Sequence, residues 1–282
     1  MKPDPAELID RFNAHAREWG VTIDDARRSE SSFIGFGHRD GLRVVLKVAR
    51  TKGEEWRSGE FLAAFNGRGM IKALERAEGA VLLERLTPGQ DLTTLSLNGR
   101  DDEATQIIAG IIERMCAVSP TLTSTIAAET LAPDFERFRH SCDALMPAGM
   151  VECAELVCRE LCASQSTRRL LHGDLHHANV LFDSRQGWVA IDPWGIMAEL
   201  EFEVGAALRN PISAPHLLAD GATLVRRLDI YTERLKFNRD RALRWAFAAT
   251  VLAALWPTDE SLGGIDMRIP FITAASTMQR II

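Results

Sequence analysis

The spacing of apolar positions gives the first part of the chain an alternation of helical and strand patterns. Over residues 4–19 apolar side chains recur every three to four positions and Gly20 follows, which predicts a capped amphipathic helix. Two β-prone runs flank the Asp-Gly pair at residues 40–41, and two more flank the Glu-Gly pair at residues 78–79. Each pair of runs predicts a hairpin, and the helical spacing over residues 51–65 predicts a helix between the hairpins.

The second part of the chain is mostly helical in pattern, and it begins after the turn-forming run Thr87-Pro88-Gly89. A β-like interruption over residues 180–191 predicts two short strands joined by a turn at 183–187. We therefore expect an α+β protein with a bilobal arrangement, a small β-rich lobe over residues 1–86 and a larger helical lobe over residues 87–282. The predicted helices of the larger lobe cover residues 101–115, 151–163, 214–235 and 239–255.

Composition narrows the class of protein. The formal net charge of −6 over 282 residues argues against a nucleic-acid-binding surface, which is normally basic. The longest nearly unbroken apolar run, residues 245–256, is too short to cross a membrane, and no secretory signal is visible at the amino terminus. The 5 cysteines include no CxxC pair. We expect a reduced, cytoplasmic protein that is a monomer or a weak homodimer, with no membrane or nucleic-acid partner.

The run RLLHGDLHHANVLF, residues 169–182, contains the spacing His-x-Asp-x-x-x-x-Asn at His172, Asp174 and Asn179, and Asp192 follows at the end of a predicted strand. This is the layout of the catalytic loop and the metal-binding aspartate in the kinase fold. Asp174 is the candidate for accepting or orienting the proton of an attacking hydroxyl. Asn179 and Asp192 supply the oxygen ligands that Mg²⁺ prefers.

Two other interpretations of this run stay open on spacing alone. The pattern can arise by chance between two core segments. The run also offers a possible zinc site from His172, Asp174, His176 and His177, although adjacent residues on a strand point to opposite faces.

Lys47 lies in the run VVLKVA, a predicted strand with apolar neighbours on both sides. A lysine buried there needs an acidic partner, although one on an edge strand can extend to solvent instead. The following helix offers Glu54, Glu55 and Glu60, and we expect Glu60 to be the partner because it sits at the predicted helix centre. Together with Asp192, this pair favours a lysine that holds nucleotide phosphates.

The runs HGDLHHANVLFD and IDPWG resemble the aminoglycoside phosphotransferase group of the protein-kinase-like superfamily. EFEVGAALRNP and DRALRWAFAATVLAALW more narrowly resemble the aminoglycoside/hydroxyurea resistance kinases, which include streptomycin 6-phosphotransferases. The resemblance covers residues 31–256. It implies transfer of the γ-phosphate of ATP, or of GTP, to a small-molecule hydroxyl, with Asp174 as base and Mg²⁺ on Asn179 and Asp192.

The resemblance also implies a nucleotide site. Adenine would bind main-chain groups of the linker between the lobes, at Glu84 to Leu86, and Ser31 and Ser32 would meet the phosphates. Asp192 is followed by Pro193-Trp194 and no activation-loop signature is visible, which argues against a protein substrate. Glu203 stands where the family usually has aspartate. We expect it to support the catalytic loop, and the alternative is altered substrate handling.

The residues that would bind the acceptor are the part of the site that the sequence constrains least. A cationic sugar requires carboxylates, although a solvated surface acid is the alternative for each candidate. His176 is a candidate for orienting Asp174 or the acceptor, or for structuring the loop, and residues 209–211 for tying the loop to a helix end. The candidate carboxylates are Glu199, Glu201, Asp259 and Glu260.

We expect an ATP-dependent phosphotransferase acting on a small cationic molecule such as streptomycin. The alternatives are a kinase of the same fold for a metabolite, such as a sugar, an amino-alcohol or a hydroxyurea-like compound, and a non-catalytic nucleotide-binding protein.

Overall fold

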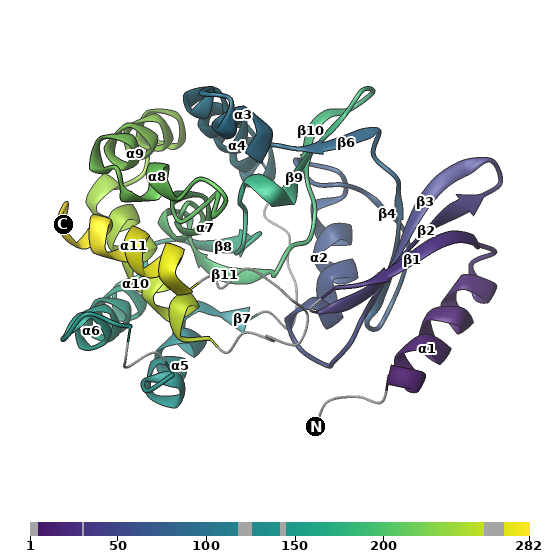
Figure 1. Cartoon of the computed structure of the whole chain (residues 1–282), viewed down its shortest axis with the longest axis horizontal. Coiled ribbons are helices and arrows are strands. Elements are labelled where there is room, and N and C mark those ends of the chain that lie inside the picture. The colour runs from purple at the N-terminus through teal and green to yellow at the C-terminus, as the bar shows by residue number, and fades with distance from the viewer. Residues whose placement is uncertain (1–4, 30, 118–125, 142–144, 257–267) are drawn as a thin grey trace.

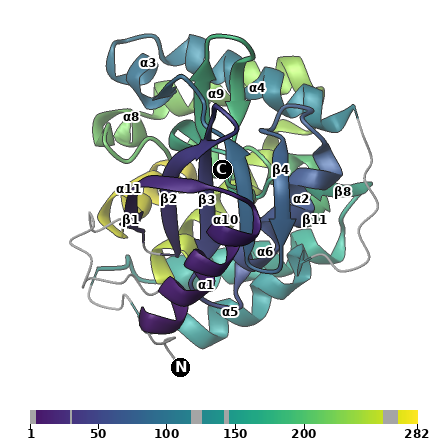
Figure 2. The same cartoon turned by 90° about the vertical axis from the view of Figure 1, so that its right-hand side faces the viewer.

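The computed structural model describes residues 5–29, 31–117, 126–141, 145–256 and 268–282, and it has two lobes (Figure 1). The small lobe is a five-stranded antiparallel sheet with a helix on either side (Figures 1 and 2). In spatial order the strands are β1 (Thr22–Arg28), β2 (Ser32–Arg39), β3 (Leu42–Ala49), β5 (Ala80–Glu84) and β4 (Ala73–Ala77); the helical elements are α1 (Pro5–Glu18), η1 (Glu54–Arg57) and α2 (Ser58–Phe65).

Both predicted hairpins are confirmed, with turns at residues 40–41 and 78–79. The predicted helix over 51–65 is divided into the 3₁₀ turn η1 and the helix α2. The pattern of apolar positions did not predict β1. Its sequence, TIDDARR, is almost entirely polar and its side chains are mostly exposed, because it is the edge strand of the sheet and lacks an alternating apolar face.

The two faces of the sheet serve different purposes. Val44, Leu46 and Val48 of β3 pack with Leu8 and Phe12 of α1 in a separate apolar cluster. The side chain of Lys47 therefore faces the other way, because successive residues of a strand alternate between faces. On that side α2 packs into a core that continues into the large lobe, so the second face of the sheet overlooks the boundary between the lobes.

The large lobe combines helices with two three-stranded sheets. Its helices are α3 (Thr93–Leu97), α4 (Asp101–Cys116), α5 (Leu131–Phe138), α6 (Met150–Ala163), α7 (Gly205–Leu208), α8 (Pro215–Ala219), α9 (Gly221–Leu235), α10 (Arg239–Leu255) and α11 (Arg268–Gln279). Its 3₁₀ turns are η2 (Ala128–Thr130), η3 (His177–Asn179) and η4 (Leu200–Phe202). One sheet has the order β10 (Gly187–Ala190), β9 (Val180–Asp183), β6 (Pro88–Asp91), and the other β7 (Ile126–Ala127), β11 (Ile196–Glu199), β8 (Arg168–Leu171).

The predicted helices of the large lobe are all present, and one of them is divided. Residues 214–235 form α8 and α9, because Asp220 caps α9 by accepting hydrogen bonds from the backbone N–H groups of Ala222 and Thr223. The α+β, two-lobed architecture is as expected. Within the part of the chain that the structure describes, no helix is long and apolar enough to span a membrane.

Two connections of the large lobe bring the predicted chemistry together. Residues 172–179 connect β8 to β9, and residues 191–195 connect β10 to β11. The hairpin of β9 and β10 places the two connections side by side, with Ile191 N–H donating to the Asn179 carbonyl over 2.9 Å. After β5 the chain passes to β6, which pairs with β9, so the chain leaves the small lobe near residues 85–87.

Candidate active site

A cavity of about 600 Å³ opens between the lobes, and it contains most of the predicted catalytic side chains. The small lobe contributes Ser31 and Glu55 to its wall. The large lobe contributes three groups of residues: the loop between β8 and β9, the loop between β10 and β11, and the segment around α7, α10 and α11. These are Gly173, Asp174, His176, Ala178, Asn179, Asp192, Pro193, Trp194, Arg209, Asn210, Ile212, Ala253, Trp256 and Phe271.

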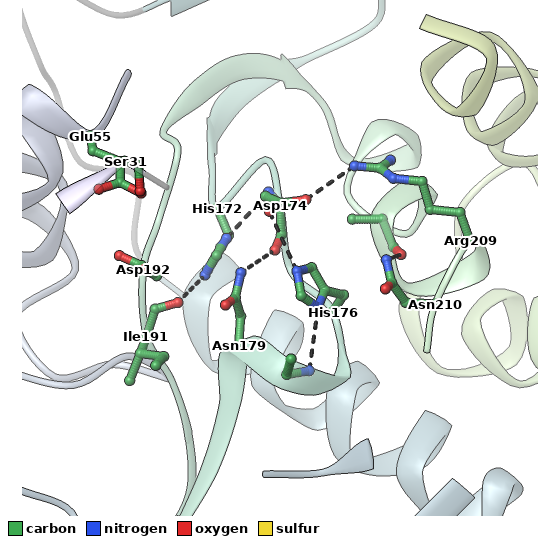
Figure 3. Close-up of polar contacts among 12 residues, drawn as sticks. Ser31, Glu55, His172, Asp174, His176, Asn179, Ile191, Asp192, Arg209 and Asn210 are labelled. Carbon is green, nitrogen blue, oxygen red and sulfur yellow. Dashed lines mark hydrogen bonds and ion pairs between the residues drawn. The ribbon is translucent and has the colours of Figure 1, made fainter. Parts of the chain in front are cut away.

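His172 shapes the catalytic loop from within (Figure 3). Its side chain is fully buried, its Nδ1 accepts from the Asp174 backbone N–H over 3.3 Å, and its Nε2 therefore donates to the Ile191 carbonyl over 2.8 Å. Burial lowers the His172 pKa to about 4, so the ring is neutral at pH 7. His172 thus connects the two loops as a structural residue.

Asp174 projects into the cavity with a basic or polar neighbour at each carboxylate oxygen (Figure 3). Arg209 Nη2 donates to Oδ1 over 3.0 Å, and His176 Nε2 lies 3.5 Å from Oδ2. Burial alone would raise the Asp174 pKa, but His176 and Arg209 outweigh it and hold the pKa below its ordinary value. Asp174 is therefore an ionised carboxylate that can accept a hydrogen bond from an incoming hydroxyl.

Asn179 and Asp192 offer oxygens next to this carboxylate. Asn179 uses its Nδ2 to donate to the Asp174 carbonyl over 3.0 Å, which leaves its Oδ1 as the acceptor end of the amide. Asp192 has a left-handed backbone, with φ of 64°, and its carboxylate lines the same cavity. One amide oxygen and one carboxylate suit Mg²⁺ accompanied by phosphate oxygens. Across the described ranges, no three or more His, Cys, Asp or Glu side chains are grouped for a metal, so the histidine-rich run is not arranged as a zinc cage.

The partner of Lys47 differs from the prediction. Lys47 Nζ lies 3.0 Å from the Glu55 carboxylate and also pairs with Asp192, whereas Glu60 pairs with Arg57 at 3.1 Å. The reason is the division of the predicted helix: Glu55 lies in η1, and α2 begins only at residue 58, so Glu60 is in its first turn. Burial would lower the Lys47 pKa, but Asp192 and Glu55 together raise it above its ordinary value.

Ser31 and Ser32 contact this lysine site through Glu55. Both hydroxyls donate to the Glu55 carboxylate, and Ser32 N–H donates to the Ser29 hydroxyl over 3.0 Å. The Ser32 side chain is fully buried, and its contact with phosphates stays a prediction. Ser31 lines the cavity beside Glu55 (Figure 3).

The linker between the lobes carries the residues proposed to face adenine. The Glu84 carboxylate pairs with Arg185, so it is not the group proposed to contact the nucleotide. The Leu86 side chain is buried in the core shared by the lobes. Arg85 N–H donates to the Arg43 carbonyl over 2.9 Å. Binding of adenine by main-chain groups of Glu84 and Leu86 stays a prediction.

Two predicted acceptor carboxylates have structural partners instead. Glu199 is fully buried; it accepts from Ser166 N–H over 2.9 Å and from Trp245 Nε1 over 2.5 Å, and it pairs with Arg241. It therefore joins β11 to α10 rather than facing a substrate. Glu201 accepts from Asn238 N–H over 3.2 Å at the start of α10, outside the described cavity wall. Asp259 and Glu260 lie outside the described residues.

Glu203 lies beneath the catalytic loop, as expected. Its side chain is buried, and its Oε2 accepts from Gly173 N–H over 3.3 Å. Burial raises its pKa to about 8, and the nearby charge of Asp174 adds to the effect.

Arg209 ties the catalytic loop to a helix end, as expected for residues 209–211. It directly follows α7, its guanidinium contacts the Asp174 carboxylate, and it lies 5.6 Å from the Phe271 ring centroid. A second buried arginine supports this segment: Arg227 pairs with Asp101 at 2.6 Å and donates to the Asn210 carbonyl over 2.7 Å. The run LRNP was the one available signal, and it does not show where Arg209 points.

Comparison with proteins of known structure identifies the fold. An aminoglycoside phosphotransferase crystallised with ADP and hygromycin B superposes with a TM-score of 0.64 at 14% identity, covering 95% of this chain and 97% of that one. A choline kinase from Streptococcus pneumoniae superposes with a TM-score of 0.65 at 13% identity, covering 98% and 100%. The protein-kinase-like fold implied by the catalytic-loop spacing is confirmed.

Comparison with sequences identifies the family. The streptomycin 3″-kinase of Klebsiella pneumoniae is 34% identical over 81% of this chain and 85% of its own length. The streptomycin 6-kinase of Streptomyces griseus is 29% identical over 92% and 84%, and the hydroxyurea phosphotransferase of Kitasatospora aureofaciens is 31% identical over 78% and 64%. The sequence model of one family matches residues 20–261, and on these grounds the chain belongs to the aminoglycoside/hydroxyurea antibiotic resistance kinases.

Proposed function

We propose that this kinase transfers the γ-phosphate of ATP to a hydroxyl of an aminoglycoside, with streptomycin as the leading acceptor. The observation that carries the proposal is the convergence of Asp174, Asn179 and Asp192 on one cavity beside Lys47. The proposed acceptor is inferred from the relatives named streptomycin 3″-kinase and streptomycin 6-kinase. We infer a cytoplasmic enzyme with a small cationic substrate, acting as a monomer or a weak homodimer.

Each group has a defined task in this reaction. The Asp174 carboxylate accepts a hydrogen bond from the acceptor hydroxyl, orients its oxygen toward the γ-phosphorus and takes its proton as the new ester bond forms. The bond between the γ-phosphorus and the β-phosphate oxygen breaks in the same step, and ADP leaves. Arg209 and His176 hold that carboxylate in place. Lys47, positioned by Glu55, supplies a cation for the α- and β-phosphates. Bound Mg²⁺, held by Asn179 and Asp192, would neutralise charge on the phosphates.

The alternatives differ in acceptor or in activity. A kinase for a metabolite would use the same groups. A non-catalytic nucleotide-binding protein would have no use for the Asp174 carboxylate in nucleotide binding, because that carboxylate pairs with Arg209 and His176 and contacts neither Lys47 nor Asp192 in the described structure. The intact set therefore favours an enzyme.

The test is Mg²⁺-dependent ADP release from ATP with streptomycin, other aminoglycosides and a panel of metabolites, with mass spectrometry to find the phosphorylated product. Asp174→Ala should lower kcat by about 10²- to 10⁴-fold and leave ATP affinity within about twofold, because the carboxylate acts on the acceptor. Asp229→Ala, which removes an exposed carboxylate paired with Arg239, is the matched control. Turnover of a metabolite but not of any aminoglycoside would reject the proposed acceptor.

A further inference from the structure

The 3₁₀ turn η1, which carries Glu55, depends on contacts from other elements. It has four residues, and short 3₁₀ segments have poorer hydrogen-bond geometry than α-helices. The Trp56 side chain is only partly buried and belongs to neither apolar cluster among the described residues. The Trp56 carbonyl accepts a hydrogen bond over 2.9 Å from Gly79 N–H, in the turn between β4 and β5. The packing of Trp56 therefore decides how firmly Glu55, the residue before it, is held.

Arg11 of α1 reaches η1 past the end of the small-lobe sheet. Its guanidinium carbon lies 4.4 Å from the Trp56 ring centroid. Nη1 donates to the Ala49 carbonyl over 3.0 Å and Nη2 to the Gly79 carbonyl over 3.4 Å, so the same group joins the last residue of β3 to the turn between β4 and β5. Arg11 thus links α1 to η1, although α1 packs on the face of the sheet away from Lys47.

Gly79 leaves space for this contact. Its backbone is left-handed, with φ of 70°, and a Cβ at this position would lie 2.6 Å from the Trp56 ring and 2.7 Å from Arg11 Nη2. Glycine is the residue that tolerates both conditions. The guanidinium is also specific, because its planar fork can donate to two carbonyls while it covers the ring, which a lysine ammonium cannot do. Arg11 is therefore fitted to this place by shape as well as by charge.

We propose that Arg11 is a positioning residue of the nucleotide site, which acts on Glu55 through Trp56. Glu55 lies 3.0 Å from Lys47 Nζ and holds that ammonium beside Asp192. Arg11 is not part of the described cavity wall, so it acts only through these residues. The proposal rests on the proposed function, in which Lys47 supplies a cation for the α- and β-phosphates of ATP.

A double-mutant cycle separates this role from a general loss of stability. The full chain is titrated by calorimetry with the β,γ-imido analogue of ATP and Mg²⁺, with no acceptor present. Arg11→Met should weaken binding about fivefold, in line with a partly desolvated cation–π contact. In the Glu55→Gln background the same substitution should weaken binding less than about twofold, because glutamine forms no ion pair with Lys47 and Arg11 has nothing left to position.

Two further variants complete the experiment. Arg17→Met removes an exposed arginine of the same helix, should leave binding unchanged, and is the matched control. Arg11→Lys keeps the charge without the planar fork, and it should show a smaller loss with the same dependence on Glu55 if Arg11→Met does not fold. A folded Arg11 variant that binds as the unmodified chain does, or that loses the same factor in both backgrounds, would overturn the proposal. If streptomycin is not phosphorylated, the proposed function fails, and the calorimetry still decides the role of Arg11.

Discussion

Glu203 provides a test of the site's electrostatics that needs no substrate. Its carboxyl is 1% exposed, one oxygen accepts a hydrogen bond from Gly173 N–H, and the other has no hydrogen-bond partner among the described residues. Its pKa is about 8 in the folded protein against 4.5 for an ordinary glutamate. Between these two pH values the folded chain holds a proton that the unfolded chain has released.

The sign and size of the effect follow from proton linkage. Because the folded state binds more protons in this window, the free energy of unfolding contributed by Glu203 falls as pH rises from 4.5 to 8. Each pH unit is worth at most about 1.4 kcal/mol, so the loss is on the order of 4 kcal/mol across the window. Glu203→Gln has nearly the same shape and cannot ionise, so it should remove this part of the pH dependence.

The assay is urea unfolding of both proteins at pH 5, 6, 7 and 8, compared as the difference between variant and unmodified chain at each pH. The difference should shift in favour of Glu203→Gln by several kcal/mol from pH 5 to pH 8. Taking differences removes the contribution of His172, whose lowered pKa gives stability that is lost as pH falls from 6.5 toward 4. A difference between Glu203→Gln and the unmodified chain that stays constant with pH would refute the reasoning.

Two further predictions concern the charged pairs of the cavity. Glu55→Gln should raise KM for ATP about tenfold in ADP-release assays, because Lys47 loses an acidic partner at 3.0 Å. Glu60→Gln should change KM for ATP less than twofold, because Glu60 pairs with Arg57. Equal effects of the two substitutions would contradict the assignment of Glu55 as the partner of Lys47. Arg209→Met should lower kcat about 10- to 100-fold, since a charged hydrogen bond is worth about 1.5–3 kcal/mol, and it should leave KM for ATP nearly unchanged. Arg226→Met, which removes a largely exposed guanidinium, is the control, and an unchanged kcat in a folded Arg209→Met would count against the role of that arginine.

The features that the sequence predicted are those encoded by short spacings. The hairpin turns at residues 40–41 and 78–79 follow from two adjacent residues each, and the five-residue separation of Asp174 and Asn179 closes one loop. The position of Asp192 follows from the length of the β9–β10 hairpin. Such local rules hold without knowledge of the rest of the fold, so the likeness to a catalytic loop was available from the sequence.

The features that the sequence missed depend on small shifts or on long-range packing. The 3₁₀ turn before α2 places Glu55 rather than Glu60 beside Lys47. The spacing of apolar positions does not distinguish a 3₁₀ turn from the first turn of an α-helix, so it could not predict this partner. Burial turns Glu199 from a candidate ligand into a core ion-pair partner. Trp194 and Phe271 are far apart in sequence, yet both line the cavity between the lobes. They come together there through the packing of α10 against α11 and the loops.

The buried Arg227 couples two helices of the large lobe to the backbone beside the cavity's arginine. Arg227 joins Asp101 at the start of α4 to the carbonyl of Asn210, the residue next to Arg209. A substitution that shifts α4 or α9 therefore shifts the backbone that carries the cavity's arginine. Substitutions in α4 and α9, outside the described cavity wall, should therefore alter activity through this backbone.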